Sequence, residues 1–313
     1  MVTAEANRAL PKNRLSAFQK VAEGRRVSTD GRAGVDAGLV SRLVADQFPQ
    51  WRDQPVVPVE VDGWDNRTYR LGSGLLVRLP TADSYVPAVE KEQRWLLVLA
   101  PHLPLPVPEP VALGAPSPDF PRPWSVRRWI EGTPVTPAMD EERLALDLAE
   151  FLVTLRAVDA REGPRAGAHS FFRGGPPAAY DEETRRCLTL LDLDDGGVWD
   201  AALASSWEGP DVWFHGDVAV GNLLARDGRL AAVIDFGTSG VGDPACDLVI
   251  AWTFFGESAR ETFRSAVGLD EETWARARGW ALWKALLGLV DDPGSTGDRR
   301  TVERVVEEHR TVS

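Results

Sequence analysis

Three polar side chains that suit phosphate chemistry, Asp217, Asn222 and Asp235, lie close together in the second half of the sequence. Asn222 follows Asp217 by five residues, and Asp235 follows Asn222 by thirteen. Two carboxylates and one amide oxygen suit Mg²⁺, a hard cation that takes few protein ligands when water and phosphate oxygens supply the others. If the chain brings these side chains together, they can hold magnesium on a phosphate group.

Short apolar segments between these residues predict the strands that position them. Strands are expected over residues 212–214, 223–225 and 230–234, and Asp227-Gly228 is a typical hairpin turn between the last two. These strands are expected to form one small sheet with the three polar side chains at its edges. The alternative is a plain hairpin with solvated polar turns, which would need this order and spacing to arise by chance.

The stretch His215-Gly-Asp217, followed by Asn222 and then by Ile-Asp235-Phe-Gly, resembles the catalytic core of the aminoglycoside phosphotransferase-like kinases. The resemblance implies that Asp217 accepts or orients the proton of an attacking hydroxyl group. It also implies that Asn222 and Asp235 hold Mg²⁺ on the phosphates of ATP, or of GTP.

Other polar residues of this region are expected to support the site. His215 is interpreted as a hydrogen-bonding brace, because Asp217 matches the motif of a catalytic base better. The later stretch Gly-Asp243-Pro-Ala-Cys-Asp247 also resembles the family, in which such acidic residues brace the catalytic loop and begin a helix.

The first third of the chain predicts a small antiparallel sheet for nucleotide binding. Alternating valines indicate a strand over residues 55–62, and further strands are expected over 68–71 and 75–79, with glycine-containing turns between them. Backbone N–H groups in such a turn can approach phosphates. The segment Asp-Asn66-Arg67-Thr-Tyr resembles the corresponding loop of the family, so Asn66 and Arg67 are expected near the nucleotide. A plain hairpin turn is the alternative.

A cation that holds the α and β phosphates is expected at Arg78. The family usually has a lysine in this third strand, whereas this sequence has Leu-Val-Arg78-Leu-Pro. Arginine stays charged and binds phosphate oxygens bidentately, so it can take over the role. The resemblance implies that a glutamate of the helix over residues 84–99 pairs with this cation, and Glu92 matches the pattern better than Glu90. A surface cation and a solvated helix charge are the alternatives.

A proline-rich segment, residues 101–123, is expected to connect that helix to the next strand. Read alone, it also fits a polyproline ligand of a binding module. A strand over residues 124–130 ends where Glu-Gly-Thr-Pro interrupts it, which places a hinge there. By position, the backbone groups of Arg128, Trp129 and Ile130 are expected to bind the purine edge.

Apolar residues at helical spacing predict helices through the rest of the chain. The expected ranges are 36–48, 140–158, 180–191, 198–206, 248–255, 258–267, 271–290 and 298–310. By resemblance the fold class is α+β, with the bilobal architecture of a protein kinase: a β-rich N-terminal lobe and a mostly helical C-terminal lobe. The expected divisions are a flexible basic tail over 1–34 with a turn of helix near residues 15–21, a nucleotide-binding lobe with the hinge over 35–131, and a catalytic and acceptor-binding lobe over 132–313.

Composition disfavours several other classes of protein. The sequence has no apolar run long enough to span a membrane and no apolar signal-peptide core at its N-terminus. Its two cysteines, Cys187 and Cys246, form no metal-ligand pattern and are expected to be buried thiols in a reducing cytoplasm. The net charge of −12 is concentrated beyond the basic first 33 residues, which argues against a nucleic acid partner.

The expected function is Mg²⁺-dependent transfer of a γ-phosphoryl group to a hydroxyl of a small molecule. The first choice of acceptor is an aminoglycoside, since an acidic protein is compatible with a cationic acceptor; macrolides and metabolites such as choline or sugars stay open. A non-catalytic nucleotide-binding pseudokinase is the alternative of another class. A protein kinase is disfavoured, because the six residues 237–242 leave no room for an activation segment.

Two further segments are possible borders of the acceptor site. The loop with Phe171-Phe172 is expected to pack against the core, and Asp291-Asp292 to be a solvated helix end, although either can also face the acceptor. The tryptophans of the helix over 271–290 are expected in the core.

Overall fold

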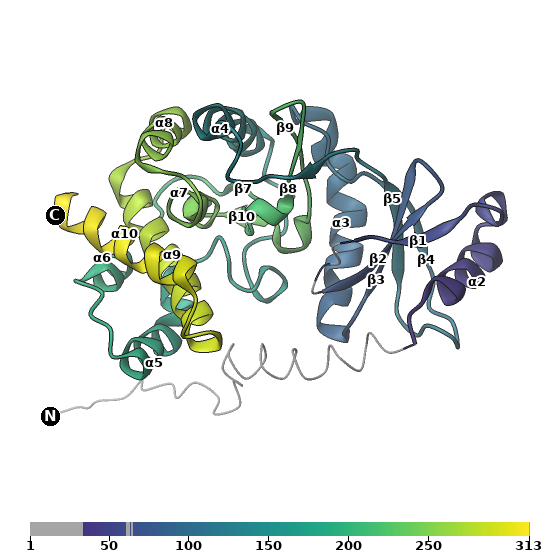
Figure 1. Ribbon diagram of the computed structural model, residues 1–313, viewed down its shortest axis with the longest axis horizontal. Helices are drawn as coiled ribbons and strands as arrows, with labels where there is room; N and C mark the ends of the chain where they lie inside the picture. The colour runs from purple at the N-terminus through teal and green to yellow at the C-terminus, as the bar shows by residue number, and fades with distance from the viewer. Residues whose placement is uncertain (1–33, 61–62, 64, 313) are drawn as a thin grey trace, which may run out of the picture.

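The computed structural model describes residues 34–60, 63 and 65–312. Almost all of the expected N-terminal tail, including the expected turn of helix near residues 15–21, therefore lies outside the described residues. The described chain folds into an antiparallel-sheet region followed by a helical region, as the sequence predicted (Figure 1).

Five antiparallel strands form the N-terminal sheet, of which four were expected: three before the helix and the strand over 124–130. Their spatial order is β1-β2-β3-β5-β4. The strands are β1 (Val56–Pro58), β2 (Asn66–Leu71), β3 (Leu75–Pro80), β4 (Pro110–Gly114) and β5 (Trp124–Arg128). The proline-rich segment thus contributes an edge strand, β4, which is where proline is tolerated in a sheet. The expected strand over 124–130 ends two residues early, at Arg128.

Helix α2 (Ala37–Gln47) covers one face of this sheet. The carboxylate of Asp36 accepts the N–H of Leu39 at 2.8 Å and caps the helix, and the helix ends before Pro49 as expected. The apolar side of α2 packs onto apolar side chains that alternate along the strands and form one buried cluster: Tyr69, Leu71, Val77, Leu79, Trp124 and Val126.

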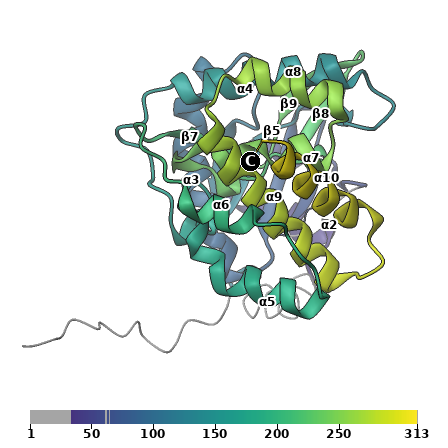
Figure 2. The same ribbon diagram turned by 90° about the vertical axis from the view of Figure 1, so that its left-hand side faces the viewer.

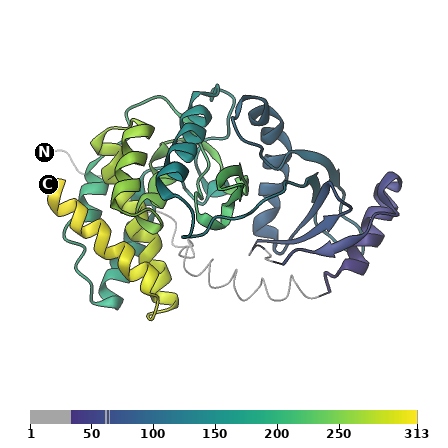
Figure 3. The same cartoon turned by 45° about the horizontal axis from the view of Figure 1, so that its top comes forward.

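Helix α3 (Val86–Leu99) covers the opposite face and also contacts the C-terminal region. Its Trp95 ring lies 5.3 Å from the Trp213 ring, and Leu96 and Leu99 belong to the larger hydrophobic core. Figure 3 shows this blue helix between the sheet and the green and yellow helices. The helix is therefore shared by the two lobes.

Two small sheets, rather than one, position the motif residues. Strand β7 (Val212–Phe214) pairs with β10 (Gly240–Gly242), whereas β6 (Thr133–Pro134), β8 (Leu223–Arg226) and β9 (Arg229–Val233) form a separate sheet. The expectation of a single sheet is wrong, because a strand that was not predicted, β10, takes the place beside β7.

Helices build the rest of the C-terminal region around one core (Figures 1 and 2). They are α4 (Glu141–Ala157), α5 (Asp181–Leu191), α6 (Val198–Ala204), α7 (Ile250–Thr253), α8 (Glu257–Val267), α9 (Glu271–Asp291) and α10 (Thr296–Val312). The expected helix over 248–255 is instead a 3₁₀ segment, Pro244–Val249, followed by the short α7. Both cysteines are free and buried. No described helix has the length and apolar character that a membrane crossing requires.

Candidate active site

The loop between β7 and β8 carries the motif residues and is held from below by a buried carboxylate. Asp247 accepts the N–H of His215 at 2.8 Å and that of Gly216 at 2.7 Å. Burial raises the pKa of Asp247, and these two bonds oppose the shift. Gly216 has φ +87°, and a Cβ there would lie 2.9 Å from the carbonyl oxygen of Thr238. The loop therefore needs glycine at this position.

His215 is fully buried and makes two hydrogen bonds that hold the loop. Its Nδ1 accepts the N–H of Asp217 at 3.2 Å, and its Nε2 lies 3.0 Å from the carbonyl oxygen of Ile234. This network places the proton on Nε2. The imidazole thus links the loop of Asp217 to the strand before Asp235, which agrees with a bracing role.

The carboxylate of Asp217 is fixed from two sides. Asn222 donates its Nδ2 to the carboxylate at 3.1 Å and to the main-chain oxygen of Asp217 at 2.9 Å. Lys284 of α9 donates its Nζ to Oδ1 at 3.0 Å. Burial alone would raise the pKa of Asp217, but Lys284 and Arg173 bring it down to about 2. Asp217 is therefore a carboxylate throughout the neutral range.

Asp235 forms an ion pair with Arg78, the predicted phosphate-binding cation. Nη2 of Arg78 lies 3.3 Å from Oδ1 of Asp235 and 3.6 Å from Oδ2 of Asp65. Asp235 has the left-handed φ of +65°, a conformation that is uncommon outside glycine and turns its carboxylate out of the strand direction. Burial and the neighbouring Asp235 charge raise the pKa of Asp65 to about 6.

Glu92 pairs with Arg78, as predicted, but its principal partner is Arg127. Nη1 of Arg78 lies 3.5 Å from Glu92, whereas Arg127 of β5 binds both carboxylate oxygens at 2.8 Å. Burial would raise the pKa of Glu92, and the two arginines bring it down to about 2. The bidentate pair explains how a fully ionised carboxylate is kept beneath the sheet.

Lys91, next to Glu92 on α3, ties the N-terminal region to the loop after Asp235. Its buried Nζ donates to the carbonyl oxygens of Gly237 at 2.7 Å and Ser239 at 2.8 Å, and contacts His169. Burial lowers the pKa of Lys91 to about 8. This contact fixes the distance between α3 and the strand end that carries Asp235.

Asn66 and Arg67 lie on strand β2 rather than in a loop. Asn66 is buried opposite Pro80, and Nη2 of Arg67 lies 3.4 Å from the hydroxyl of Tyr69. The loop before them includes residues 61, 62 and 64, which lie outside the described residues. The turn over residues 72–74 lies at the hinge end of the sheet, since Trp129 donates its N–H to the oxygen of Gly74. That turn is thus remote from Arg78 and is no phosphate loop.

Two of the backbone N–H groups that were expected to bind the purine already donate hydrogen bonds within the protein. The N–H groups of Arg128 and Trp129 are bonded to the oxygens of Glu109 and Gly74, both at 2.9 Å. Of the three expected residues, only Ile130 keeps an N–H that bonds to none of the described residues. The groups of the hinge backbone that are left to bind the purine are therefore the N–H of Ile130 and the carbonyl oxygens.

The oxygen ligands near the loop fit a magnesium ion that is shared with phosphates. In the described part of the chain, no three His, Cys, Asp or Glu side chains converge on one point, so a metal held by protein alone is not supported. Asn222 donates its Nδ2 to Asp217, so its side-chain oxygen Oδ1 is left as a metal ligand. The N–H of Ile234 donates to the main-chain oxygen of Asn222, which places the neighbouring Asp235 beside Asn222. One amide and one carboxylate oxygen are a small set, and Mg²⁺ commonly completes such a set with water and phosphate.

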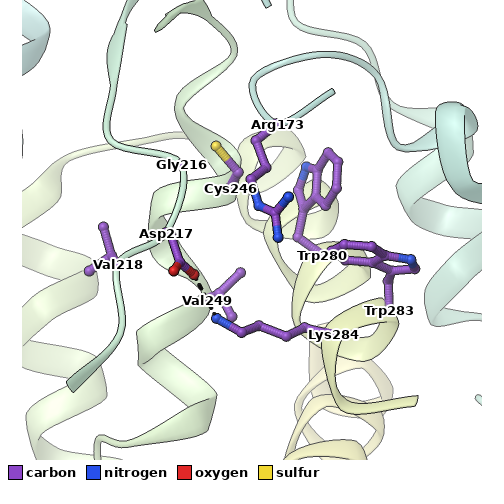
Figure 4. A pocket seen from close by; sticks show the side chains of 9 residues that line it. All are labelled: Arg173, Gly216, Asp217, Val218, Cys246, Val249, Trp280, Trp283 and Lys284. Carbon is purple, nitrogen blue, oxygen red and sulfur yellow. Dashed lines mark hydrogen bonds and ion pairs between the residues drawn. The ribbon is translucent and has the colours of Figure 1, made fainter. Parts of the chain in front are cut away.

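A pocket lies on the other side of Asp217, between the catalytic loop and α9 (Figure 4). Its ionisable side chains are Asp217, Lys284, Arg173 and the thiol of Cys246. The tryptophans of α9, Trp274, Trp280 and Trp283, are buried in the core as expected, and Trp280 and Trp283 also form the far wall of the pocket. The full lining is Arg173, Gly216, Asp217, Val218, Cys246, Val249, Trp280, Trp283 and Lys284.

Asp243 supports the pocket from behind. It caps the segment Pro244–Val249 and binds Nε of Arg276 on α9 at 2.6 Å. Burial raises its pKa, against the effect of the arginine. The loop of Phe171 and Phe172 is half-exposed rather than packed in the core, and it borders the pocket through Arg173.

The sequence-based interpretation missed five side chains that the fold brings to the site: Asp65, Lys91, Arg127, Arg173 and Lys284. Asp65 and Lys91 are direct neighbours of predicted residues and were within reach of the same motif. Arg127 follows Val126 on a predicted strand, and successive side chains of a strand point to opposite faces of the sheet. The side of the sheet on which Arg127 meets Glu92 could therefore have been predicted. Arg173 and Lys284 carry no local signal, because only the folding of distant segments brings them to Asp217.

Comparison with known proteins defines the class. A family model for the phosphotransferase enzyme family matches residues 56–280, which includes every motif residue described above. The chain belongs to this family, and it is a phosphotransferase that acts on hydroxyl groups. Comparison of the sequence with curated proteins finds no match.

Solved structures share the fold at low sequence identity. A GDP complex of a variant of aminoglycoside 2'-phosphotransferase-IIIa is 19% identical, with a TM-score of 0.64, over 88% of this chain and 98% of that one. The ternary complex of APH(2'')-IIa with streptomycin and ATP is 18% identical, with a TM-score of 0.58, over 87% and 96%. The apoenzyme of the macrolide 2'-phosphotransferase MphH from Brachybacterium faecium is 22% identical, with a TM-score of 0.57, over 87% and 97%. These matches confirm the kinase-like fold.

Proposed function

We propose that this protein is a Mg²⁺-dependent kinase that moves the γ-phosphoryl group of ATP or GTP to a hydroxyl group of a small molecule. The observation that carries the proposal is the convergence of Asp217 and Asn222 with Asp235 and Arg78 across the two lobes. Family membership supports the reaction class, and the structures of relatives with GDP or ATP support a nucleotide as donor.

Asp217 orients the acceptor hydroxyl in this mechanism. A carboxylate with a pKa of about 2 is too weak a base to remove a hydroxyl proton before the reaction, but it accepts a hydrogen bond from that hydroxyl. This hydrogen bond aims the hydroxyl oxygen at the γ-phosphorus. As the new P–O bond forms, the bond from the γ-phosphorus to the β–γ bridging oxygen breaks, the nucleoside diphosphate leaves with that electron pair, and the hydroxyl proton passes to Asp217.

The cations on the nucleotide side stabilise the charge of the phosphates. Arg78 is held by Glu92, which is itself held by Arg127, so the guanidinium is oriented before the nucleotide arrives. Asn222 and Asp235 would hold Mg²⁺, which supplies further positive charge to the phosphate oxygens when bound.

The matched test is turnover of wild type beside Asp217→Ala. We expect Mg²⁺-dependent nucleotide consumption that depends on an acceptor and is lost in the variant, while the variant still binds the nucleotide. Nucleotide binding without turnover in either protein, against a wide acceptor panel, would instead support the nucleotide-binding pseudokinase. The presence of Asp217 together with Asn222 and Asp235 favours the kinase, since nucleotide binding alone does not require Asp217.

The acceptor panel follows from the sequence and the relatives. From the sequence, aminoglycosides were the first choice and macrolides an alternative, and the names of the similar structures include both classes. Small alcohols, sugars and hydroxy acids complete the panel, because the charged side chains of the pocket affect which acceptor binds.

A further inference from the structure

The side chains that line the acceptor pocket carry a net positive charge, whereas the whole protein is acidic. Asp217 is the only carboxylate among the pocket-lining residues, and Lys284 already pairs with it at 3.0 Å. The remaining charged group is the Arg173 guanidinium. The net charge of −12 therefore does not describe the surface that an acceptor meets.

Arg173 has no ion-pair partner among the described residues. Its guanidinium lies 5.3 Å from the Trp283 ring centroid, and Figure 4 shows it directed toward Trp280 above the pocket. Glu183 accepts the indole N–H of Trp283 at 2.9 Å and is buried, so it does not line the pocket. A guanidinium that stacks on an indole keeps its N–H donors free for an anion.

The loop around Arg173 is fixed by its backbone. The N–H of Arg173 donates to the oxygen of Ser170, whose hydroxyl donates to the oxygen of Arg173. Gly174 follows with φ +77° and lies so close to β7 that a Cβ there would be 1.9 Å from the Phe214 ring. Because the main chain is held at both sides, the base of the guanidinium stem cannot move away from the pocket.

We propose that the acceptor carries an oxyanion group, a carboxylate or a phosphate, in addition to the hydroxyl that is phosphorylated. This inference rests on the proposed function. Arg173 binds the oxyanion and Asp217 receives the hydroxyl, since both side chains line the same pocket. A polyamine would place ammonium groups beside an unpaired guanidinium, which repels them in a partly buried site.

The test uses benzyl alcohols that carry an anionic, neutral or cationic group at the para position. They are 4-(hydroxymethyl)benzoate, its neutral amide, the corresponding benzylamine, and 4-(hydroxymethyl)phenylphosphonate as the phosphate-like arm. Dissociation constants are measured by NMR titration with the full chain saturated with Mg²⁺ and a non-hydrolysable ATP analogue. We expect one of the two anions to bind at least about tenfold more tightly than the amide, and the amine to bind most weakly. Which anion is tighter distinguishes a carboxylate from a phosphate acceptor.

Two variants decide whether Arg173 is responsible. Arg173→Gln should reduce the preference for the anion to about onefold. The matched control is Arg94→Gln, since Arg94 also stacks on a tryptophan, 4.5 Å from the Trp95 ring, but lies on α3 away from the pocket. This control should keep the wild-type preference.

Several results would overturn the proposal. They are equal binding of all probes, tightest binding of the amine, absence of binding at millimolar concentrations, or a preference that survives Arg173→Gln. Weaker nucleotide binding in Arg173→Gln with an unchanged preference would assign the arginine to the nucleotide instead. The proposed function is tested separately by acceptor-dependent nucleotide consumption of wild type and Asp217→Ala across the wider acceptor panel, which can succeed or fail whatever charge preference the probes show.

Discussion

At the scale of single residues, Glu92 is the carboxylate on which the nucleotide-side cations depend. We expect Glu92→Gln to lower the free energy of unfolding by about 3 kcal/mol at pH 7, because it leaves the buried Arg127 without its counter-charge. The pKa of Glu92 is about 2 when folded and near 4.3 in an unfolded chain, so its contribution is complete above pH 4.3 and is lost as the pH falls toward 2. The free energies of unfolding of wild type and Glu92→Gln, measured with urea at pH 7, 5, 4 and 3, should converge as the pH falls. A constant difference over that range would contradict the assignment.

Lys284 is a positioning residue for Asp217. We expect Lys284→Met to lower kcat by about 10- to 100-fold, because the carboxylate loses one of its two fixed partners and turns away from the acceptor. Nucleotide affinity should stay unchanged, since Lys284 lies on the acceptor side. Steady-state kinetics of Lys284→Arg should show partial recovery. A purely structural role would instead leave kcat unchanged in both variants once the folded fraction is taken into account.

At the scale of elements, the loop that carries Arg173 lies close against the Phe214 side chain of β7. Gly174→Ala is expected to lower stability by about 2 to 4 kcal/mol, from the left-handed backbone and the overlap with Phe214. Gly221→Ala is the control, because a Cβ there meets no atom within 4 Å and its φ is not left-handed. Thermal unfolding of the two variants measures the difference. Equal melting temperatures would show that the loop relaxes without cost.

The elements also show what sequence can and cannot predict. Helices α4 and α9 were predicted to within one residue at each end, since their caps, Asp140 and Asp270, are local signals. The partner of β7 was not predicted, because β10 is three residues long and pairs across a long sequence separation. Short strands give no periodicity, so their pairing is a property of the fold.

The same limit applies to the site. Asp217, Asn222 and Asp235 were predicted from a motif whose residues are close in sequence, and Glu92 from the helix that follows Arg78. Lys284 reaches Asp217 over 67 residues, and no pattern in α9 separates it from a solvated lysine. The acidic composition pointed to a cationic acceptor, whereas the side chains that face the pocket point the other way.

At the scale of the whole molecule, Lys91 connects the two lobes. Lys91→Met should lower stability by about 2 to 4 kcal/mol, because the carbonyl oxygens of Gly237 and Ser239 lose their buried donor. Hydrogen exchange over residues 236–239 should become faster. The exposed Arg94→Gln on the same helix should change neither quantity. Unchanged exchange in Lys91→Met would mean that other contacts hold the lobes at this point.

The tryptophan pair in the pocket wall has an optical consequence. The rings of Trp280 and Trp283 lie 5.6 Å apart at 85°, close enough for their electronic transitions to couple and to give a paired positive and negative band in the far-ultraviolet circular dichroism spectrum. The pairs Trp252–Trp274 and Trp95–Trp213 give a similar signal from elsewhere in the fold. Only the first pair lines the pocket, so a ligand that binds there is expected to change one component of the spectrum and to leave the others as an internal reference. The protein thus carries its own label-free reporter of acceptor binding.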